Sequence, residues 1–306
     1  MTKQIGFFTD TTLCIGCKAC EVACKQWNQL PDDGFHMTGM SYDNTGHLGA
    51  STWRHVAFIE RPEALPGQGS PRDGVESEHA FAELKPLGQP SPTSVLGSEI
   101  SPSHIQTPVP AAAPSFAWLM MSDVCKHCER AGCLEMCPTG AILRTEFGSV
   151  YVQPDICNGC GYCVSACPFG VIDRREDDGR AWKCTLCYDR LKGDLVPACA
   201  KHCPTASIQF GEIGELKQRA KERVQQLHDR GVAGAYLYGA DAASQPGTEG
   251  LRAFFLLCDK PETYNLPPDP IVPTKNLAAS WGSMFMAIAG LAALAVGSVL
   301  SARSAS

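Results

Sequence analysis

The sequence lacks a surplus of positive charge. Its 306 residues contain 26 Lys and Arg against 32 Asp and Glu, which gives a net charge of −6. Nucleic-acid-binding modules usually carry a basic excess, so no nucleic-acid partner is expected. Residues 1–10 also lack the apolar segment of a secretory signal peptide. With no export signal expected on the chain itself, a secreted disulfide scaffold is not expected either.

The motifs of several enzyme classes are also missing. The sequence contains no P-loop, no G-x-G-x-x-G dinucleotide fingerprint and no pattern typical of a Ser-His-Asp triad. We therefore assign no catalytic residue to this chain. Its apolar content of 44% is nevertheless enough to form a folded core.

Cysteine, by contrast, is abundant, with 17 residues. One of them, Cys258, ends a short apolar run and is expected to be an inert buried thiol. The other sixteen fall into four groups that each end in x3-C. These groups are C-x2-C-x2-C-x3-C at Cys14, Cys17, Cys20 and Cys24; C-x2-C-x4-C-x3-C-P at Cys125, Cys128, Cys133 and Cys137; C-x2-C-x2-C-x3-C-P at Cys157, Cys160, Cys163 and Cys167; and C-x2-C-x11-C-x3-C-P at Cys184, Cys187, Cys199 and Cys203.

This spacing is typical of [4Fe–4S] clusters. Three closely spaced thiolates can bind three irons of one cubane, and in two-cluster ferredoxins the fourth cysteine of the motif binds the other cluster. The step from Cys163 to Cys167 spans about 6 Å if helical and under about 14 Å if extended, so two clusters held in this way lie close together. Four cubanes need sixteen thiolates, the number found in the groups. Zinc sites, which use separated ligand pairs, and disulfides are the less favoured alternatives.

The segments between the cysteine groups predict two ferredoxin-like modules. Residues 141–144 and 150–152 flank a turn and predict a β-hairpin, and 171–172 with 181–182 predict a second one. The second and third cysteine groups then form an inner module, residues 116–180. The first and fourth groups must pair across the chain to form an outer module, from residues 1–61 and 181–210.

The remaining regions differ in composition. Residues 62–115 contain ten of the 22 prolines and no cysteine, which predicts an irregular Pro-, Ser- and Gly-rich insertion. A plain spacer is the favoured interpretation of this insertion, and a binding loop is the alternative. Residues 211–275 form an extension with an amphipathic helix expected over 215–229, ended at Gly231, and a buried strand over 253–258.

Residues 276–302 contain no charged side chain. As a helix, the apolar stretch 277–300 would be about 36 Å long, enough to cross a bilayer core of about 30 Å. Trp281 would lie near the interface. We predict a single transmembrane helix over 276–302 that contacts the lipid bilayer through 277–300, with a buried helix of a soluble protein as the alternative. The segment has no His, so haem on this chain is not expected.

Several residues beside the cysteines have expected supporting roles. Gly16, Gly159 and Gly161 are expected to allow tight turns around sulfur. Four basic residues near the ligands are expected either to raise cluster potentials or to be ordinary solvated charges. They are Lys126, His127, Lys183 and Arg190.

At the cysteine groups the chain resembles the four-cluster iron–sulfur subunits of the molybdopterin (dimethyl-sulfoxide-reductase-type) oxidoreductases. The second and fourth groups are the most specific part of this resemblance, which covers about residues 5–210 apart from the Pro-rich segment. It implies an α+β fold with two ferredoxin-like 2[4Fe–4S] modules and four sets of cluster ligands. The implied sets are Cys14, Cys17, Cys20 and Cys203; Cys184, Cys187, Cys199 and Cys24; Cys125, Cys128, Cys133 and Cys167; and Cys157, Cys160, Cys163 and Cys137.

After the cluster motifs, the chain resembles the β subunit of membrane-bound formate dehydrogenase in residues 208–211, the helix 215–229, residues 230–231, 237–238, 259–264 and 266–267, and the C-terminal helix. This resemblance implies a non-catalytic electron-transfer subunit. Its expected partners are a molybdopterin or tungstopterin catalytic subunit and a membrane cytochrome b or quinone-reactive subunit. The equivalent subunit of a hydrogenase, or of a sulfur-compound or dimethyl sulfoxide reductase, is the alternative, and a metal-stabilised scaffold without a redox role is a third hypothesis.

The same resemblance implies a place in the cell. The expected location is the inner membrane, with the cluster domain on the extracytoplasmic side, carried across with a signal-bearing catalytic partner. A cytoplasmic position of the cluster domain is the alternative.

Overall fold

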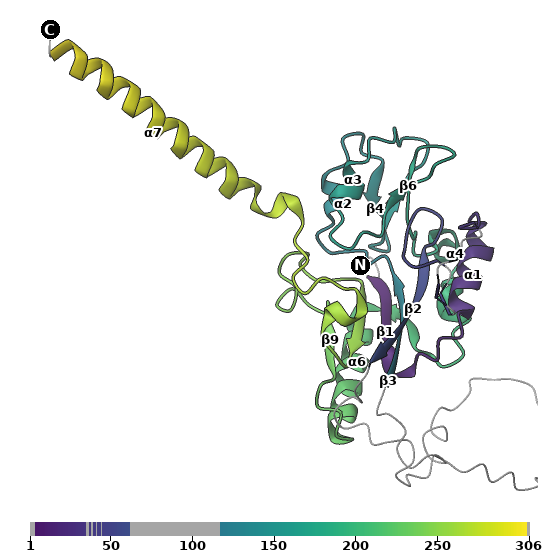
Figure 1. The fold of residues 1–306 in the computed structure, drawn as a ribbon. Coiled ribbons are helices and arrows are strands. Elements are labelled where there is room, and N and C mark those ends of the chain that lie inside the picture. Colours follow the sequence, from purple (N-terminus) through teal and green to yellow (C-terminus); the bar gives the residue numbers. More distant parts are fainter. Residues whose placement is uncertain are drawn as a thin grey trace, which may run out of the picture.

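The structure is a computed structural model that describes residues 4–34, 37, 39–40, 42–43, 45–61 and 117–304. The predicted Pro-rich insertion, 62–115, lies outside these residues. The described chain mixes short helices with short strands, as the α+β prediction requires (Figure 1). One long helix projects away from the rest.

A four-stranded sheet joins the N-terminal strand to three strands from residues 208–257. Its order is β8 (Ile208–Glu212), β1 (Ile5–Asp10), β10 (Ala253–Leu257) and β9 (Tyr236–Tyr238). Strand β1 pairs in parallel with β10 and antiparallel with β8. Both β1 and β10 are buried along their whole length. This burial explains the wholly apolar sequence of β10, Ala253 to Leu257, whereas β1 ends in two buried polar residues, Thr9 and Asp10. Cys258 directly follows β10 and is 7% exposed, as expected of a buried thiol.

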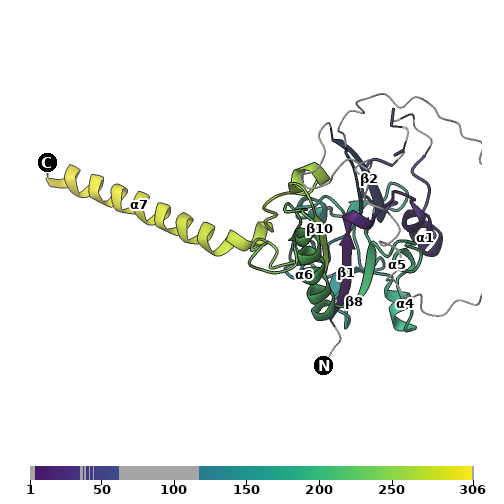
Figure 2. The ribbon, with the colours of Figure 1, turned by 90° about the horizontal axis from the view of Figure 1, so that it is seen from below.

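Helix α6 (Ile213–Asp229) packs against β1 and β8 of this sheet (Figure 2). Leu216, Ala220 and Leu227 are buried on its inner face, which confirms the predicted amphipathic pattern. The helix begins two residues before the predicted start. It ends as predicted, since Gly231 follows with a φ of +87°.

The outer module is assembled from distant segments. Strand β2 (Arg54–Arg61) of this module pairs antiparallel with β3 (Ala117–Val124), which comes from the start of the predicted inner module, and Arg54 lies opposite Val124. Helix α1 (Ala19–Asn28) packs against α5 (Ala198–Lys201), and α4 (Tyr188–Lys192) lies near them (Figure 2). The first and fourth cysteine groups are therefore neighbours in space.

The inner module contains α2 (Gly132–Glu135), α3 (Tyr162–Ser165) and two small hairpins. The pairing of β4 (Ile142–Arg144) with β5 (Val150–Val152) matches the first predicted hairpin. The prediction for the second hairpin was wrong by two residues. Its strands are β6 (Asp173–Arg174) and β7 (Ala181–Trp182), because Val171 and Ile172 are buried between cysteine-lined cores instead of pairing in the ladder.

Helix α7 (Leu277–Ser304) is 28 residues long and follows a short 3-10 turn at Pro273–Asn276. The segment Pro273–Ser298 is long and apolar enough to cross a membrane, and none of it is buried against the rest of the chain. The turn contacts α2, where Thr274 is hydrogen-bonded to Glu135. Both ribbon views place the start of α7 on the opposite side of the fold from α1 (Figures 1 and 2).

Candidate metal centres

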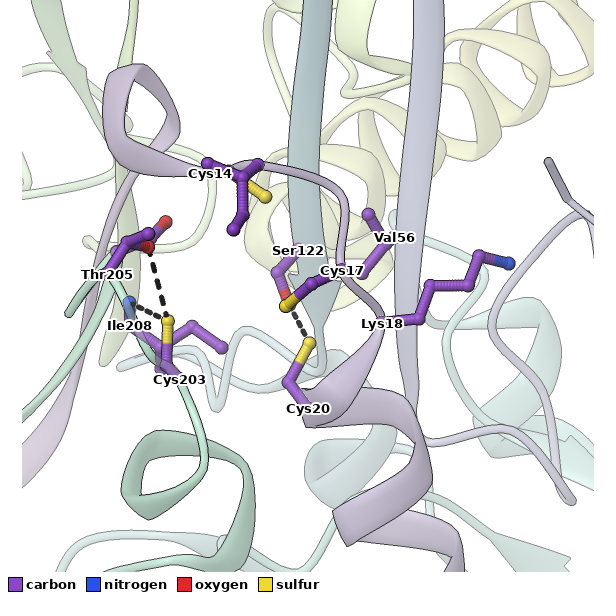
Figure 3. Close-up of a pocket in the computed structure, with 11 residues that line it drawn as sticks. Cys14, Cys17, Lys18, Cys20, Val56, Ser122, Cys203, Thr205 and Ile208 are labelled. Carbon is purple, nitrogen blue, oxygen red and sulfur yellow. Dashed lines mark hydrogen bonds between the residues drawn. The ribbon is translucent and has the colours of Figure 1, made fainter. Parts of the chain in front are cut away.

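The first cavity that the cysteines form is lined by four of them, Cys14, Cys17, Cys20 and Cys203 (Figure 3). Cys14 and Cys17 lie on the loop before α1, Cys20 lies in the first turn of α1, and Cys203 follows α5. Their sulfurs surround a common space. We call these four residues the Cys14 set.

A second cavity is lined by Cys125, Cys128, Cys133 and Cys167. We call these four residues the Cys125 set. Cys125 follows β3, Cys133 lies in α2 and Cys167 follows α3. Burial raises the pKa of the Cys133 thiol to about 12, and neighbouring sulfurs of the set add to the effect.

The other eight cysteines form two further groups of neighbours. Burial raises the pKa of Cys24, and nearby sulfurs of the fourth cysteine group raise it further. In the same way, burial and neighbouring sulfurs raise the pKa of Cys163 to about 11. These neighbours define the Cys184 set (Cys184, Cys187, Cys199 and Cys24) and the Cys157 set (Cys157, Cys160, Cys163 and Cys137).

The structure therefore brings all sixteen cysteines together in the four combinations that the resemblance implies. Among the described residues, no three His, Cys, Asp or Glu side chains are placed to hold a single metal ion. In each of the two cavities, the four sulfurs instead line a common space, as the ligands of a cluster larger than a single ion do. Which cysteine binds which cluster stays a prediction.

Electrostatic effects between neighbouring sets indicate that the sets lie in a row. Burial alone would lower the pKa of Lys183, but the sulfurs of Cys125, Cys133 and Cys184 outweigh it and raise the pKa. Lys183 therefore lies where the Cys125 and Cys184 sets meet. Arg54 lies likewise between the Cys14 and Cys184 sets, and Cys163 is close enough to affect the Cys133 thiol. The order is Cys14 set, Cys184 set, Cys125 set, Cys157 set.

Backbone amides donate hydrogen bonds to several of these sulfurs. The N–H groups of Leu186, Ala181 and Ile208 lie 3.4, 3.4 and 3.5 Å from the sulfurs of Cys184, Cys157 and Cys203. Hydrogen bonds of this kind stabilise negative charge on sulfur and set cluster potentials. Soft thiolate ligands with amide donors around them fit an iron–sulfur cluster.

His127 gives a further test of this fit. Its Nδ1 accepts a hydrogen bond from the Val150 amide at 3.1 Å, so the neutral ring carries its proton on Nε2. This Nε2 is buried and has no hydrogen-bond partner among the residues that the structure describes, and the residue lines the cavity of the Cys125 set. A sulfur in the cavity would accept the hydrogen bond that Nε2 offers.

The predicted turn glycines and basic residues are found where the chemistry needs them. Gly16, Gly159 and Gly161 have φ values of +67°, +72° and +80°, which confirms that they allow tight turns.

The four basic residues singled out in the sequence are buried, so the interpretation as solvated charges was wrong. They are Lys126, His127, Lys183 and Arg190, between 1% and 7% exposed.

Two residues of the site were missed in the sequence. Arg54 and Ser122 lie on β2 and β3, far along the chain from any cysteine they contact. The only local signal is a charged residue that opens an apolar strand. That signal does not distinguish a site residue from an ordinary strand end.

Comparisons with known proteins agree with this geometry. Residues 13–141 and 116–213 each match a family model described as a 4Fe-4S dicluster domain. The chain is 34% identical over 275 residues to the nitrate-inducible formate dehydrogenase iron–sulfur subunit of Escherichia coli strain K12, covering 89% of this chain and 75% of the relative. It is 35% identical to the formate dehydrogenase iron–sulfur subunit of Haemophilus influenzae, covering 87% and 70%. It is 30% identical to one polypeptide of the anaerobic dimethyl sulfoxide reductase of E. coli, covering 72% and 78%.

The fold and the four cysteine sets define a ferredoxin-type protein built from two dicluster domains, with four [4Fe–4S] clusters. The chain belongs to the family of iron–sulfur subunits represented by these relatives, the electron-transfer subunits of membrane-bound oxidoreductases.

Proposed function

We propose that this chain relays electrons from a formate-oxidising catalytic subunit, through its four clusters, to a partner in the membrane. The formate dehydrogenase relatives support this proposal because they match 87–89% of the chain, whereas the dimethyl sulfoxide reductase relative matches 72%. The proposed partners are a molybdenum or tungsten pterin subunit and a membrane cytochrome b or quinone-reactive subunit. A dimethyl sulfoxide reductase subunit is the second candidate, since that relative is 30% identical.

Each of the four cysteine sets is proposed to hold one cluster. When bound, the clusters supply the one-electron carriers. The observation that supports the relay best is the row of sets, which leads from exposed Cys17 through buried cysteines to exposed Cys160. The protein residues hold the sulfurs, exclude water from the middle of the row and donate hydrogen bonds to the sulfurs.

The membrane anchor suggests a direction for this relay. The turn before α7 contacts α2, and α2 contacts α3, the helix that contains Cys163 of the Cys157 set. We infer that the Cys157 set faces the membrane partner. The Cys14 set lies at the other end, with Ile15 and Val22 exposed beside Cys17, and it is proposed to face the catalytic subunit. The extracytoplasmic side of the inner membrane remains the proposed location.

The test uses the native complex, isolated anaerobically from membranes through a tag on this chain. Formate alone should produce reduced [4Fe–4S] signals in EPR, with dithionite as the control. If only dithionite produces them, formate is the wrong donor and the electron donor must be another compound. Mass identification of the copurified catalytic chain then separates the two candidates.

Two variants test the direction. In Cys160→Ser, formate should still reduce the clusters upstream while quinone reduction is lost. In Cys17→Ser, formate should reduce none of the remaining clusters in this chain. The reverse pattern would show that electrons enter at the Cys157 set.

A further inference from the structure

Arg54 is a fully buried cation. It lies on β2, its side chain is 1% exposed, and its guanidinium lies 5.0 Å from the centre of the Phe7 ring. Among the described residues, no Asp or Glu forms an ion pair with it. A buried charge without a counter-charge is strongly unfavourable, so something else must supply the negative charge.

The cysteine sulfurs supply it. The Arg54 Nη2 donates a hydrogen bond to the sulfur of Cys199 at 3.2 Å. Burial alone would lower the pKa of Arg54, but nearby thiolates, above all Cys199 and Cys20, outweigh it and raise the pKa. Arg54 therefore faces cysteines of two different sets, because Cys199 belongs to the Cys184 set and Cys20 to the Cys14 set.

Ser122 completes the connection to the Cys14 set. The Arg54 Nη1 donates to the Ser122 carbonyl at 3.2 Å and to its hydroxyl oxygen at 3.4 Å. The same hydroxyl lies 3.2 Å from the sulfur of Cys20 (Figure 3). With its proton directed at that sulfur, the hydroxyl accepts from Arg54 and donates to Cys20. A continuous polar path thus runs from Cys20 through Ser122 and Arg54 to Cys199.

We propose that Arg54 is a positioning residue shared by the first two clusters of the relay, and that it raises the reduction potentials of both. The inference rests on the ligand sets proposed above. Reduction adds one negative charge to a cluster, and a buried cation nearby stabilises that added charge more than it stabilises the oxidised state. A single cation between two sites acts on both, so it shifts the two potentials in the same direction.

The experiment is an EPR-monitored redox titration of the tagged membrane complex. In Arg54→Gln, two of the four clusters should become harder to reduce. At a fixed potential, their ratio of reduced to oxidised form should fall about tenfold, which is 59 mV for one electron. Arg54→Lys keeps the charge, so the two potentials should stay close to their wild-type values. Ser122→Ala should shift only the cluster bound by the Cys14 set.

The control is Arg61→Gln at the other end of β2, where Arg61 is ion-paired with Asp259 at 3.1 Å. This variant should leave all four potentials unchanged. Unchanged potentials in Arg54→Gln with four clusters assembled, or an equal shift of all four, would overturn the inference. If Arg54→Gln fails to assemble clusters, Arg54→Lys decides: normal assembly and potentials support the charge role, and a lost cluster contradicts it.

Ligand variants separate this inference from the proposed ligand sets. Cys20→Ser and Cys199→Ser should each remove a different one of the two signals that Arg54→Gln shifts. If both remove the same signal, the assigned sets are wrong, and the role of Arg54 between two clusters is overturned with them.

Discussion

Cys203 lines the same cavity as Cys14, although the two cysteines come from the first and the last of the cysteine groups. The Cys203 sulfur lies 3.5 Å from the Ile208 amide at the start of β8, the strand that pairs with β1. The sheet that joins the two ends of the cluster-bearing chain therefore also places Cys203 beside the first group. Cys24, the fourth cysteine of that group, instead faces the Cys184 set.

This exchange of ligands predicts that Cys203→Ser and Cys24→Ser affect different clusters. Cys203→Ser should convert or remove the cluster of the Cys14 set, and Cys24→Ser that of the Cys184 set. Iron content and EPR of the anaerobic complex measure the loss. Cys258→Ser is the matched control, because Cys258 lies outside all four sets, and it should keep four clusters. Loss of the same cluster in both ligand variants would contradict the exchange.

Gly16 and Gly140 offer a second, matched test. Both have left-handed backbones, with φ of +67° and +68°. A Cβ at Gly16 would lie 2.6 Å from atoms of Met120 and Phe58, whereas a Cβ at Gly140 would meet nothing within 4 Å. Alanine in this conformation costs about 1–2 kcal/mol at either position, and overpacking at Gly16 adds about 1–3 kcal/mol.

We therefore expect Gly16→Ala to lose the cluster of the Cys14 set while Gly140→Ala keeps all four. Iron and sulfide per chain, together with the temperature at which half the cluster absorbance is lost, measure the difference. Equal losses in the two variants would show that backbone conformation alone, and not contact with Met120 and Phe58, decides the outcome.

Local patterns predicted much of this molecule, and the cysteine count led to the pairing of the first and fourth groups, but the pairing of distant strands could not be predicted. The cysteine groups, the hairpin of β4 and β5 and the inner face of α6 depend on residues close together in sequence, so spacing and periodicity reveal them. The parallel pairing of Phe8 with Phe254 does not, because each strand is only an apolar run until its partner is known. Arg54 was missed for the same reason. It comes next to Cys199 only because β2 and β3 place it there.

His55 predicts a dependence of stability on pH. Burial lowers its pKa, and the nearby carboxylate of Asp43, 3.2 Å from Nε2, opposes this shift without cancelling it. The neutral ring therefore favours the folded state. This stabilisation is complete above the ordinary pKa of about 6.5 and is lost as the pH falls through the lowered value. Burial raises the pKa of neighbouring Glu21, which acts in the opposite direction as the pH falls.

Comparison with a variant isolates the contribution of His55. His55→Gln keeps a side chain that can hydrogen-bond to Thr45, whose hydroxyl lies 3.0 Å from Nδ1, but it does not titrate. Between pH 7.5 and 5.5, the midpoint temperature of cluster loss should fall more steeply in the wild-type chain than in this variant. Parallel pH profiles would contradict the prediction.

Helix α7 predicts how the chain is held at the membrane. Its described side chains over residues 277–298 are exposed, so none of them supports the cluster-binding fold.

Leu291 lies near the middle of the apolar segment and Ala278 near its start. An arginine at the centre of a membrane helix costs about 2.5–3.5 kcal/mol, whereas one near the end can place its charge at the interface. We expect Leu291→Arg to release the chain from alkaline-washed membranes and Ala278→Arg to stay bound, with four clusters per chain in both. An equal membrane-bound fraction for the two variants, or release of the wild-type chain by the wash, would show that α7 does not span the bilayer.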